Sequence, residues 1–282
     1  MKLFNKSAEV FIPDQTEEKK AIERTTHMAI AAHQDDVEIM AYHGIVNCFQ
    51  SKTNHFFACV VTNGSGSARD NIYKDYSDQE MIDVRKIEQK KAAYLGEYGG
   101  LALLDYPSKM VKDKSDMNIV NEFKTLLSLA KPKVLYTHNL ADKHDTHIGV
   151  VTKVIKAIRM MPKSERPEKV YGCEVWRNLD WVNDNEKQYL DVSKHPNLAA
   201  SLVEVFDSQI IGGKRYDLAT IGRRLSNATF NASHAVDETN ALTYAIDLTP
   251  LILDDELDIV TFITNYIKSF EQDVINRIKK VN

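Results

Sequence analysis

Two short clusters of histidine and aspartate have the residue types and spacing for metal chemistry. The first holds His33, Asp35 and Asp36, and the second is the segment Asp142–His147, with two aspartates and two histidines. A catalytic zinc takes three nitrogen or oxygen ligands from the protein and leaves one position open. Either cluster alone is more often a helix cap or a set of ordinary histidines, so it is their combination that favours a metal site.

The two clusters together supply a complete ligand set. His33, Asp36 and His147 provide the three ligands, which leaves Asp35 beside the metal without coordinating it. A metal lowers the pKa of water from about 16 toward about 7, and a neighbouring free carboxylate is suited to accept the proton. The sequence therefore predicts zinc at His33, Asp36 and His147, with Asp35 as general base.

Each cluster follows a segment of strand length and precedes a helical pattern. The apolar run HMAIAA (27–32) leads into the first cluster and KVLYT (133–137) into the second, and helices are expected over 37–49 and 148–160. Ligands collect at the carboxyl ends of the strands in an open parallel sheet. The two clusters are therefore expected at the same edge of one sheet.

The remaining pattern alternates strands and helices. A strand over 55–62 ends in the loop NGSGS, and helices over 79–95 and 119–129 flank a short apolar run at 101–104. This alternation predicts an α/β fold with a mainly parallel sheet covered on both faces. The last segment, 254–280, has apolar residues at helical spacing and predicts an amphipathic helix that docks on the body.

We expect one domain over residues 1–282. It has a motif-bearing core at about 25–170 and an extension over 171–282 that carries a substrate loop and the final helix.

The two clusters resemble the signatures of a known family. AAHQDDVEI is similar to the AHPDDxE motif of the LmbE-like (PIG-L) deacetylases, and HNLADKHDTHIGVV is similar to their second motif. The resemblance implies a Rossmann-like three-layer fold, one zinc on His33, Asp36 and His147, and Asp35 as general base. It also implies that His144 acts as the cation that stabilises the oxyanion or protonates the leaving amine. Members of the family remove acetyl groups from N-acetylglucosamine conjugates.

A third segment resembles the same family, and two positions depart from it. Arg85 matches the arginine that contacts substrate there, although Arg85 and Glu88 also fit an ordinary helix pair. Gln34 replaces a proline, and Thr146 replaces the aspartate that tunes the catalytic histidine. Asp142 and Asp145 are the candidates to replace that aspartate, and we expect Asp142 to be the partner that holds His144 protonated.

The segment after residue 170 mixes aromatic and cationic side chains. Two interpretations stay open: a pocket for a sugar ring that carries an acidic group, and a structural loop with solvated arginines. The residues concerned are Trp176, Arg177, Trp181, the run 206–217, Arg223, Arg224 and His234.

Composition narrows the class of protein. The formal net charge of -4 gives no basic surface for nucleic acid. We expect no signal peptide and no membrane span, and hence a cytoplasmic protein. Cys48, Cys59 and Cys173 are predicted to be buried and unpaired, and no GxGxxG motif follows the first strand.

The expected function is zinc-dependent hydrolysis of an N-acetyl amide on a small molecule, an N-acetylglucosamine-type conjugate. Two alternatives remain: a zinc amidase that acts on a non-sugar N-acyl compound, and a relative that binds ligand without turnover. A homo-oligomer is compatible with the sequence.

Overall fold

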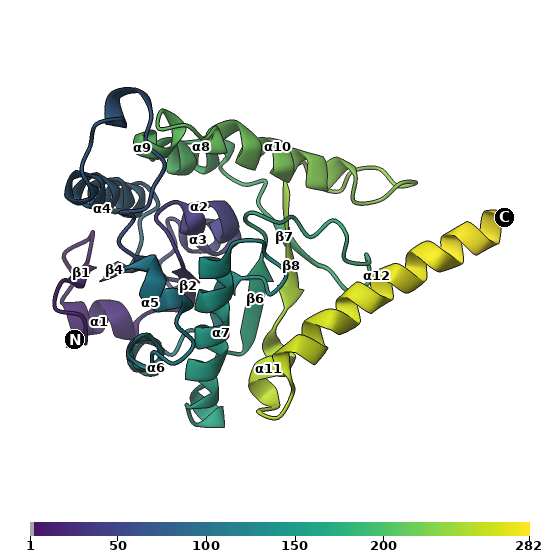
Figure 1. Ribbon diagram of the computed structural model, residues 1–282, viewed down its shortest axis with the longest axis horizontal. Coiled ribbons are helices and arrows are strands. Elements are labelled where there is room, and N and C mark those ends of the chain that lie inside the picture. The colour runs from purple at the N-terminus through teal and green to yellow at the C-terminus, as the bar shows by residue number, and fades with distance from the viewer. Residues whose placement is uncertain (1–2) are drawn as a thin grey trace.

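The computed structural model describes residues 3–282, which form an α/β fold around an eight-stranded sheet (Figure 1). The strand order is β1-β4-β3-β2-β5-β6-β8-β7. Strands β2 to β6 run parallel to their neighbours within this group, whereas β1, β8 and β7 pair antiparallel. The strands are β1 (Glu9–Phe11), β2 (His27–Ala31), β3 (Phe56–Thr62), β4 (Gly100–Tyr106), β5 (Val134–His138), β6 (Lys169–Cys173), β7 (Gln188–Asp191) and β8 (Leu242–Asp247). The expectation of a mainly parallel sheet is confirmed.

Helices cover both faces of the sheet and produce two apolar layers. One face packs against α1 (Glu18–Glu23), α5 (Ser108–Lys112), α6 (Asn118–Ala130), α7 (Asp145–Arg159) and α11 (Thr249–Leu253). The other packs against α2 (Asp36–Met40), α3 (Tyr42–Cys48), α4 (Asp78–Leu95) and α8 (Pro196–Glu204). Because both faces are covered, a central strand such as β3 (FFACVVT) is buried at every residue.

The strand order places the site by a general rule. In the series β4-β3-β2-β5-β6 the chain moves outward in one direction from β2 and then starts again on its other side at β5. This is the topological switch point of a doubly wound sheet, where the loops after the two central strands separate and leave a crevice. The loops after β2 and β5 are the ones that carry the two histidine and aspartate clusters.

Local sequence explains where the flanking helices begin and end. Ser77 and Glu80 form a capping box at the start of α4. The helix expected over 37–49 is interrupted at Ala41, whose backbone is not helical, so α2 and α3 are separate. None of the helices within residues 3–282 combines the length and apolar character that crossing a bilayer requires.

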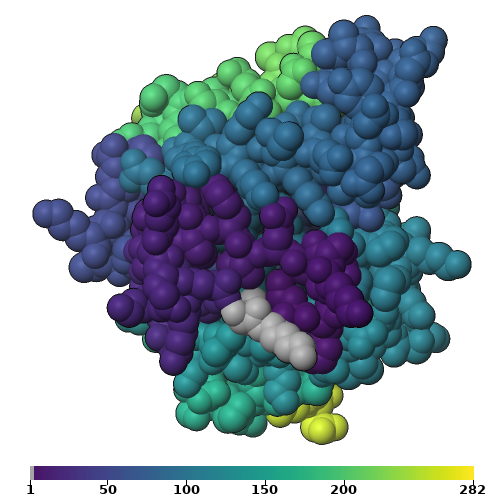
Figure 2. All heavy atoms as spheres, turned by 90° about the vertical axis from the view of Figure 1, so that its left-hand side faces the viewer, coloured from purple at the N-terminus to yellow at the C-terminus, as the bar shows by residue number. Residues whose placement is uncertain are grey.

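The extension beyond residue 170 is more regular than the sequence pattern indicates. It adds β7 and β8 to the sheet, and its helices α8, α9 (Asp207–Ile210) and α10 (Tyr216–Thr229) lie along one side of the molecule (Figure 1). At the opposite edge of the sheet, β1 pairs with β4, and Figure 2 shows the purple N-terminal segment forming the surface there.

The final helix, α12 (Ile259–Val281), exists, but it does not dock along its length as the sequence predicts. Phe262 in its first turns is buried, whereas Val260 and Ile278 are 66% and 55% exposed. In Figure 1 the helix extends away from the body toward the C-terminus. It begins later than expected because the Asp258 side chain accepts a hydrogen bond from the Thr261 backbone N–H and caps it there.

Candidate active site

A cavity of about 360 Å³ opens at the carboxyl ends of β2 and β5. Its floor comes from the loop and helix after β2 and from the start of α7, and its walls come from the NGSGS loop and the extension beyond residue 170. Its lining includes His33, Asp35, Asp36, Gly64, Arg85, Lys112, His144, Thr146, Val175, Trp176, Gln209, Lys214 and Tyr216. The two sequence clusters thus meet in one cavity.

Three ligand atoms meet at nearly equal distances beside this cavity. The Nδ1 atom of His33 lies 3.1 Å from Oδ2 of Asp36, and Nε2 of His147 lies 3.2 Å from each of those two atoms. Zinc bonds of about 2.0 to 2.1 Å in tetrahedral geometry separate the ligand atoms by about 3.3 Å. The spacing of the donor atoms and their mixture of nitrogen and carboxylate oxygen therefore fit a zinc ion.

The charges of this cluster also match a cation site. Burial raises the pKa of Asp36, but His147 and His33 lower that pKa by more than burial raises it. The carboxyl therefore stays ionised at neutral pH. Burial lowers the pKa of His147, but Asp36 and Asp142 outweigh it and raise the value to about 9. A proton on His147 thus offsets the two carboxylates when no cation does so.

Asp142 contacts His147 and not the ring of His144, which corrects the sequence-based expectation. Its Oδ2 atom lies 3.3 Å from Nδ1 of His147, and it also accepts a hydrogen bond from the Trp176 backbone N–H. Its Oδ1 atom accepts the backbone N–H of His144. The aspartate therefore fixes the tautomer of His147, a candidate metal ligand, because the turn before α7 brings the carboxylate to Nδ1 of that ring.

His144 has a different environment from the one expected for a permanent cation. Its Nδ1 atom accepts a hydrogen bond from the Thr146 backbone N–H, as the N-cap of α7. Burial lowers the pKa of His144 to about 4, and the neighbouring histidines 147 and 33 contribute to the shift. Because Nδ1 is an acceptor, the neutral ring carries its proton on Nε2.

His138, at the end of β5, is a polar residue of this site that the sequence patterns did not identify. Its side chain is fully buried, and its ring stacks on His147 at a centroid distance of 3.8 Å. Its Nε2 atom lies 3.7 Å from Asp36 but accepts the backbone N–H of Ala32 at 2.8 Å. The lone pair on that nitrogen is therefore in use, so His138 supports the loop after β2 and is a poor ligand. The sequence feature that could have identified His138 is its position at the end of β5, directly before the loop that carries the second cluster.

Asp35 occupies a strained backbone position at the start of α2. Its φ of 92° lies in a region that non-glycine residues rarely adopt, which is typical of functional sites. Burial raises the pKa of Asp35 to about 7, with Arg85 lowering it and Asp36 raising it. Asp35 is 5% exposed and lines the cavity. These are the properties of a base that ionises near neutral pH.

Arg85 is buried under Asp35 instead of projecting toward solvent. It is 1% exposed, its Nη2 atom lies 3.5 Å from the Asp35 carboxylate, and it also donates to the backbone carbonyl of Gln34. Glu88 lies 4.0 Å away and accepts two hydrogen bonds from Ser208. Arg85 therefore contacts the candidate base directly, while it still forms part of the cavity wall.

Gln34 and Gly64 fix the loops around the base. The Gln34 side chain donates to the Thr62 carbonyl at 2.8 Å and so joins the loop after β2 to the end of β3. Gly64 has a φ of 78°, and a Cβ there would lie 2.7 Å from Gln34. A glutamine in place of the family proline is thus accommodated by a glycine turn opposite it.

The aromatic and cationic residues beyond position 170 divide between the site and other regions. Trp176 stands 6.2 Å from the His144 ring and 6.1 Å from Tyr216, and Lys214 lies over its face at 5.3 Å. Trp181 packs instead against Phe270 of α12. The remaining candidates outside the main cavity are Arg177 and His234, which are exposed, and Arg223 and Arg224, which line an adjoining cavity.

Comparison with known proteins shows a family to which part of the chain is similar. The family described as PIG-L, GlcNAc-PI de-N-acetylase, matches residues 28–158, the segment that carries both clusters. The matched segment is 131 of the 282 residues, just under half of the chain. A search of curated protein sequences finds no match.

Solved structures share the fold at low sequence identity. GalB, the 4-carboxy-2-hydroxymuconate hydratase from Pseudomonas putida, matches with a TM-score of 0.59 at 14% identity, over 79% of this chain and 95% of its own. The N,N'-diacetylchitobiose deacetylase from Pyrococcus horikoshii gives 0.58 at 13% identity, over 82% and 88%. The zinc-inhibited form of teicoplanin deacetylase Orf2 gives 0.57 at 12% identity, over 79% and 97%.

Proposed function

We propose that this protein is a zinc-dependent deacetylase that hydrolyses the N-acetyl amide of a small, sugar-type conjugate. The observation that carries the proposal is the arrangement of His33, Asp36 and His147, whose donor atoms are 3.1 to 3.2 Å apart and adjoin the ionisable carboxylate of Asp35. The family match supports the same reaction, and two of the three similar structures named above are of deacetylases. Because GalB is a hydratase with this fold, the fold alone does not decide the reaction.

The residues divide the work as follows. When bound at His33, Asp36 and His147, zinc supplies a Lewis acid that polarises a carbonyl group and acidifies water. Asp35 accepts the proton of the attacking water, because it ionises near neutral pH and lines the cavity. Arg85 positions that carboxylate through the ion pair between its guanidinium and Asp35.

His144 acts on the other side of the reacting amide. Its Nδ1 atom is occupied by the Thr146 N–H, so its Nε2–H is the group that donates a hydrogen bond. A donor at this position stabilises the negative oxygen that develops when the amide carbon is attacked. The proton that the departing amine needs comes from Asp35, which has taken it from the attacking water. Thr146 contributes its backbone N–H to this arrangement.

Release of acetate is the direct test. The zinc-loaded protein is incubated with N-acetylglucosamine and with N-acetylated glucosamine conjugates, with and without a chelator. We expect acetate and a free amine in equal amounts, and loss of both with chelator. Acetate from non-sugar N-acyl compounds alone would make it a zinc amidase of another class. Tight ligand binding without acetate from any amide would show a binding protein.

A further inference from the structure

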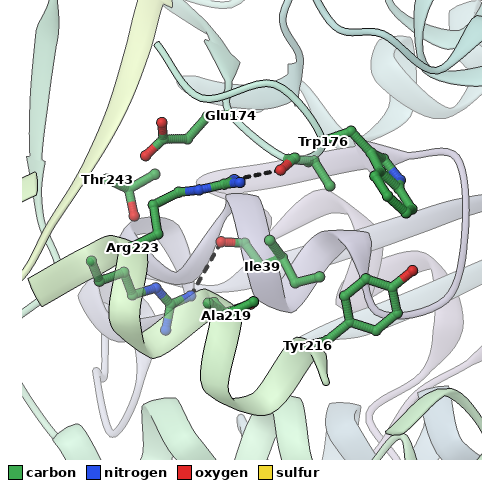
Figure 3. A pocket seen from close by; sticks show the side chains of 10 residues that line it. Ile39, Glu174, Trp176, Tyr216, Ala219, Arg223 and Thr243 are labelled. Carbon is green, nitrogen blue, oxygen red and sulfur yellow. Dashed lines mark hydrogen bonds between the residues drawn. The ribbon is translucent and has the colours of Figure 1, made fainter. Parts of the chain in front are cut away.

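A second, smaller cavity adjoins the candidate active site. It measures about 150 Å³ and shares part of its wall with the larger cavity, namely Ile39, Val175, Trp176 and Tyr216. Figure 3 shows that the side chains around it come from α2, α10, the segment after β6 and, with Thr243, the strand β8. A molecule bound at the candidate zinc ligands His33, Asp36 and His147 can therefore extend into this cavity along Trp176.

Arg224 brings a buried positive charge to this cavity. It is 3% exposed, and its Nη2 atom donates to the backbone carbonyls of Glu38 and Ile39 at the end of α2. Within residues 3–282, its Nε and Nη1 atoms have no hydrogen-bond partner. Burial lowers the pKa of Arg224 to about 10, which leaves it charged at neutral pH. Unpartnered donors on a buried cation are costly unless a ligand fills them.

The Arg224 guanidinium lies 4.9 Å from the centroid of the Tyr42 ring and is attracted by the charge of Glu174, but neither residue accepts a hydrogen bond from its free donors. Arg223 lies beside it and donates to the carbonyl of Val175 (Figure 3). In the described part of the chain, neither guanidinium has a carboxylate within 4.0 Å. Glu174, the acidic residue in the lining, accepts hydrogen bonds from Asn227, Tyr244 and Leu179 through both its oxygens. The cavity therefore holds two cations and one carboxylate that already has its partners.

We propose that this cavity is a subsite for an anionic group of the substrate, a carboxylate or a phosphate. The acetyl amide of the same substrate lies at the proposed zinc site. The inference rests on the proposed deacetylase function and narrows its substrate to acidic N-acetyl compounds. The anion takes the free donors of Arg224 and Arg223, and charge-assisted hydrogen bonds of this kind are the strong ones. The Trp176 ring lies next to both His144 and Tyr216, and the face that Lys214 does not cover offers an apolar surface for the body of a sugar.

The test compares neutral and acidic forms of one substrate. N-acetylglucosamine is compared with its 6-phosphate and with N-acetylmuramic acid, which carries a carboxylate. The zinc-loaded wild type is assayed beside Arg224→Gln, Arg223→Gln and the control Arg277→Gln, which removes an exposed, ion-paired arginine on α12. Binding of the three compounds is also measured by calorimetry on the Asp35→Asn background, so that a binding constant is obtained without turnover. Thermal unfolding checks that each variant is folded.

We expect kcat/KM and affinity for at least one acidic compound to exceed those for the neutral sugar by tenfold or more. Each of the two glutamine variants should lose roughly tenfold to a hundredfold of that preference, with the neutral sugar changed less than about threefold and the control unchanged. Because Arg223 is only half-buried, its variant tests the subsite even if Arg224→Gln unfolds.

Equal binding and turnover of neutral and acidic compounds would overturn the subsite, and so would a preference that both variants retain. A loss that is equal for all three compounds would assign Arg224 to holding the end of α2 and would also overturn it. Selective, arginine-dependent binding without acetate release would support the subsite and overturn the proposed reaction instead.

Discussion

The Oδ2 atom of Asp142 lies 3.3 Å from Nδ1 of His147, whose Nε2 atom lies 3.2 Å from Asp36. The imidazole is thus held between two carboxylates, one on each ring nitrogen. With a proton fixed on Nδ1 by Asp142, Nε2 presents its lone pair to a metal. In the proposed zinc site this contact would make Asp142 a positioning residue for the candidate ligand His147.

Replacing Asp142 should weaken the metal site. In Asp142→Asn the amide holds the His147 ring less strongly and lowers its basicity, so we expect zinc affinity to fall by about 10- to 100-fold. Competition with a chromophoric chelator measures this affinity. Asp145→Asn is the matched control, because Asp145 is exposed at the same helix start. Unchanged zinc affinity in Asp142→Asn would show that the contact has no role in metal binding.

Zinc binding should release a proton from His147. The two carboxylates raise the pKa of His147 to about 9 in the metal-free protein, so the ring is protonated at pH 7.5 and must lose that proton to become a ligand. Apparent zinc affinity should therefore rise as pH increases toward about 9. Calorimetry in buffers of different ionisation enthalpy counts the protons released. If close to zero protons are released per zinc bound at pH 7.5, His147 does not coordinate the metal.

Removing the candidate base should separate catalysis from metal binding. Asp35→Asn keeps the shape of the side chain but cannot accept a proton, so we expect normal zinc content and a loss of about 10² to 10⁴ in kcat. The wild-type rate should fall as the pH drops through the pKa of Asp35, which burial raises to about 7 and a bound cation lowers. The residual rate of the variant should lack this acid limb. Loss of zinc together with activity would instead identify Asp35 as a ligand.

His43 should make stability depend on pH. The Nδ1 atom of His43 forms a hydrogen bond of 2.8 Å with the Tyr136 hydroxyl. Burial lowers the pKa of His43 from 6.5 to about 4. Between these values the unfolded chain binds the proton and the folded one does not, so stability present above pH 6.5 is lost as pH falls toward 4.

For His43→Gln, which keeps a polar group near Tyr136, this part of the loss should disappear. The difference in the free energy of unfolding between pH 7.5 and pH 5 should be smaller than in the wild type by roughly 1 to 2 kcal/mol. Urea unfolding at the two pH values measures it. The same pH dependence in both proteins would contradict the assignment.

The two motif clusters and the elements around them were predictable because they are local. His33, Asp35 and Asp36 follow a contiguous apolar strand and begin a helix, and the second cluster repeats that order. Parallel strands with a reversal of winding direction bring such loops to one edge, so residues far apart in sequence were expected to meet, and they do.

The partners of those residues were decided only by the tertiary structure. Whether Asp142 contacts His144 or His147 depends on the path of one turn, and the role of His138 depends on which backbone N–H faces its ring. Hydrogen-bond geometry of a few tenths of an ångström determines both, and residue order carries no such information.

The same holds for the segments that follow residue 170. Apolar spacing predicted the helix α12 but not that much of its apolar side stays exposed, since spacing shows which residues share a face and not what covers it. The sequence by itself determined the reactive groups and the sheet edge that presents them. Packing α10 against α2 decided that Arg224 reaches the carbonyls of Glu38 and Ile39, because that contact joins segments that only the folded chain brings together.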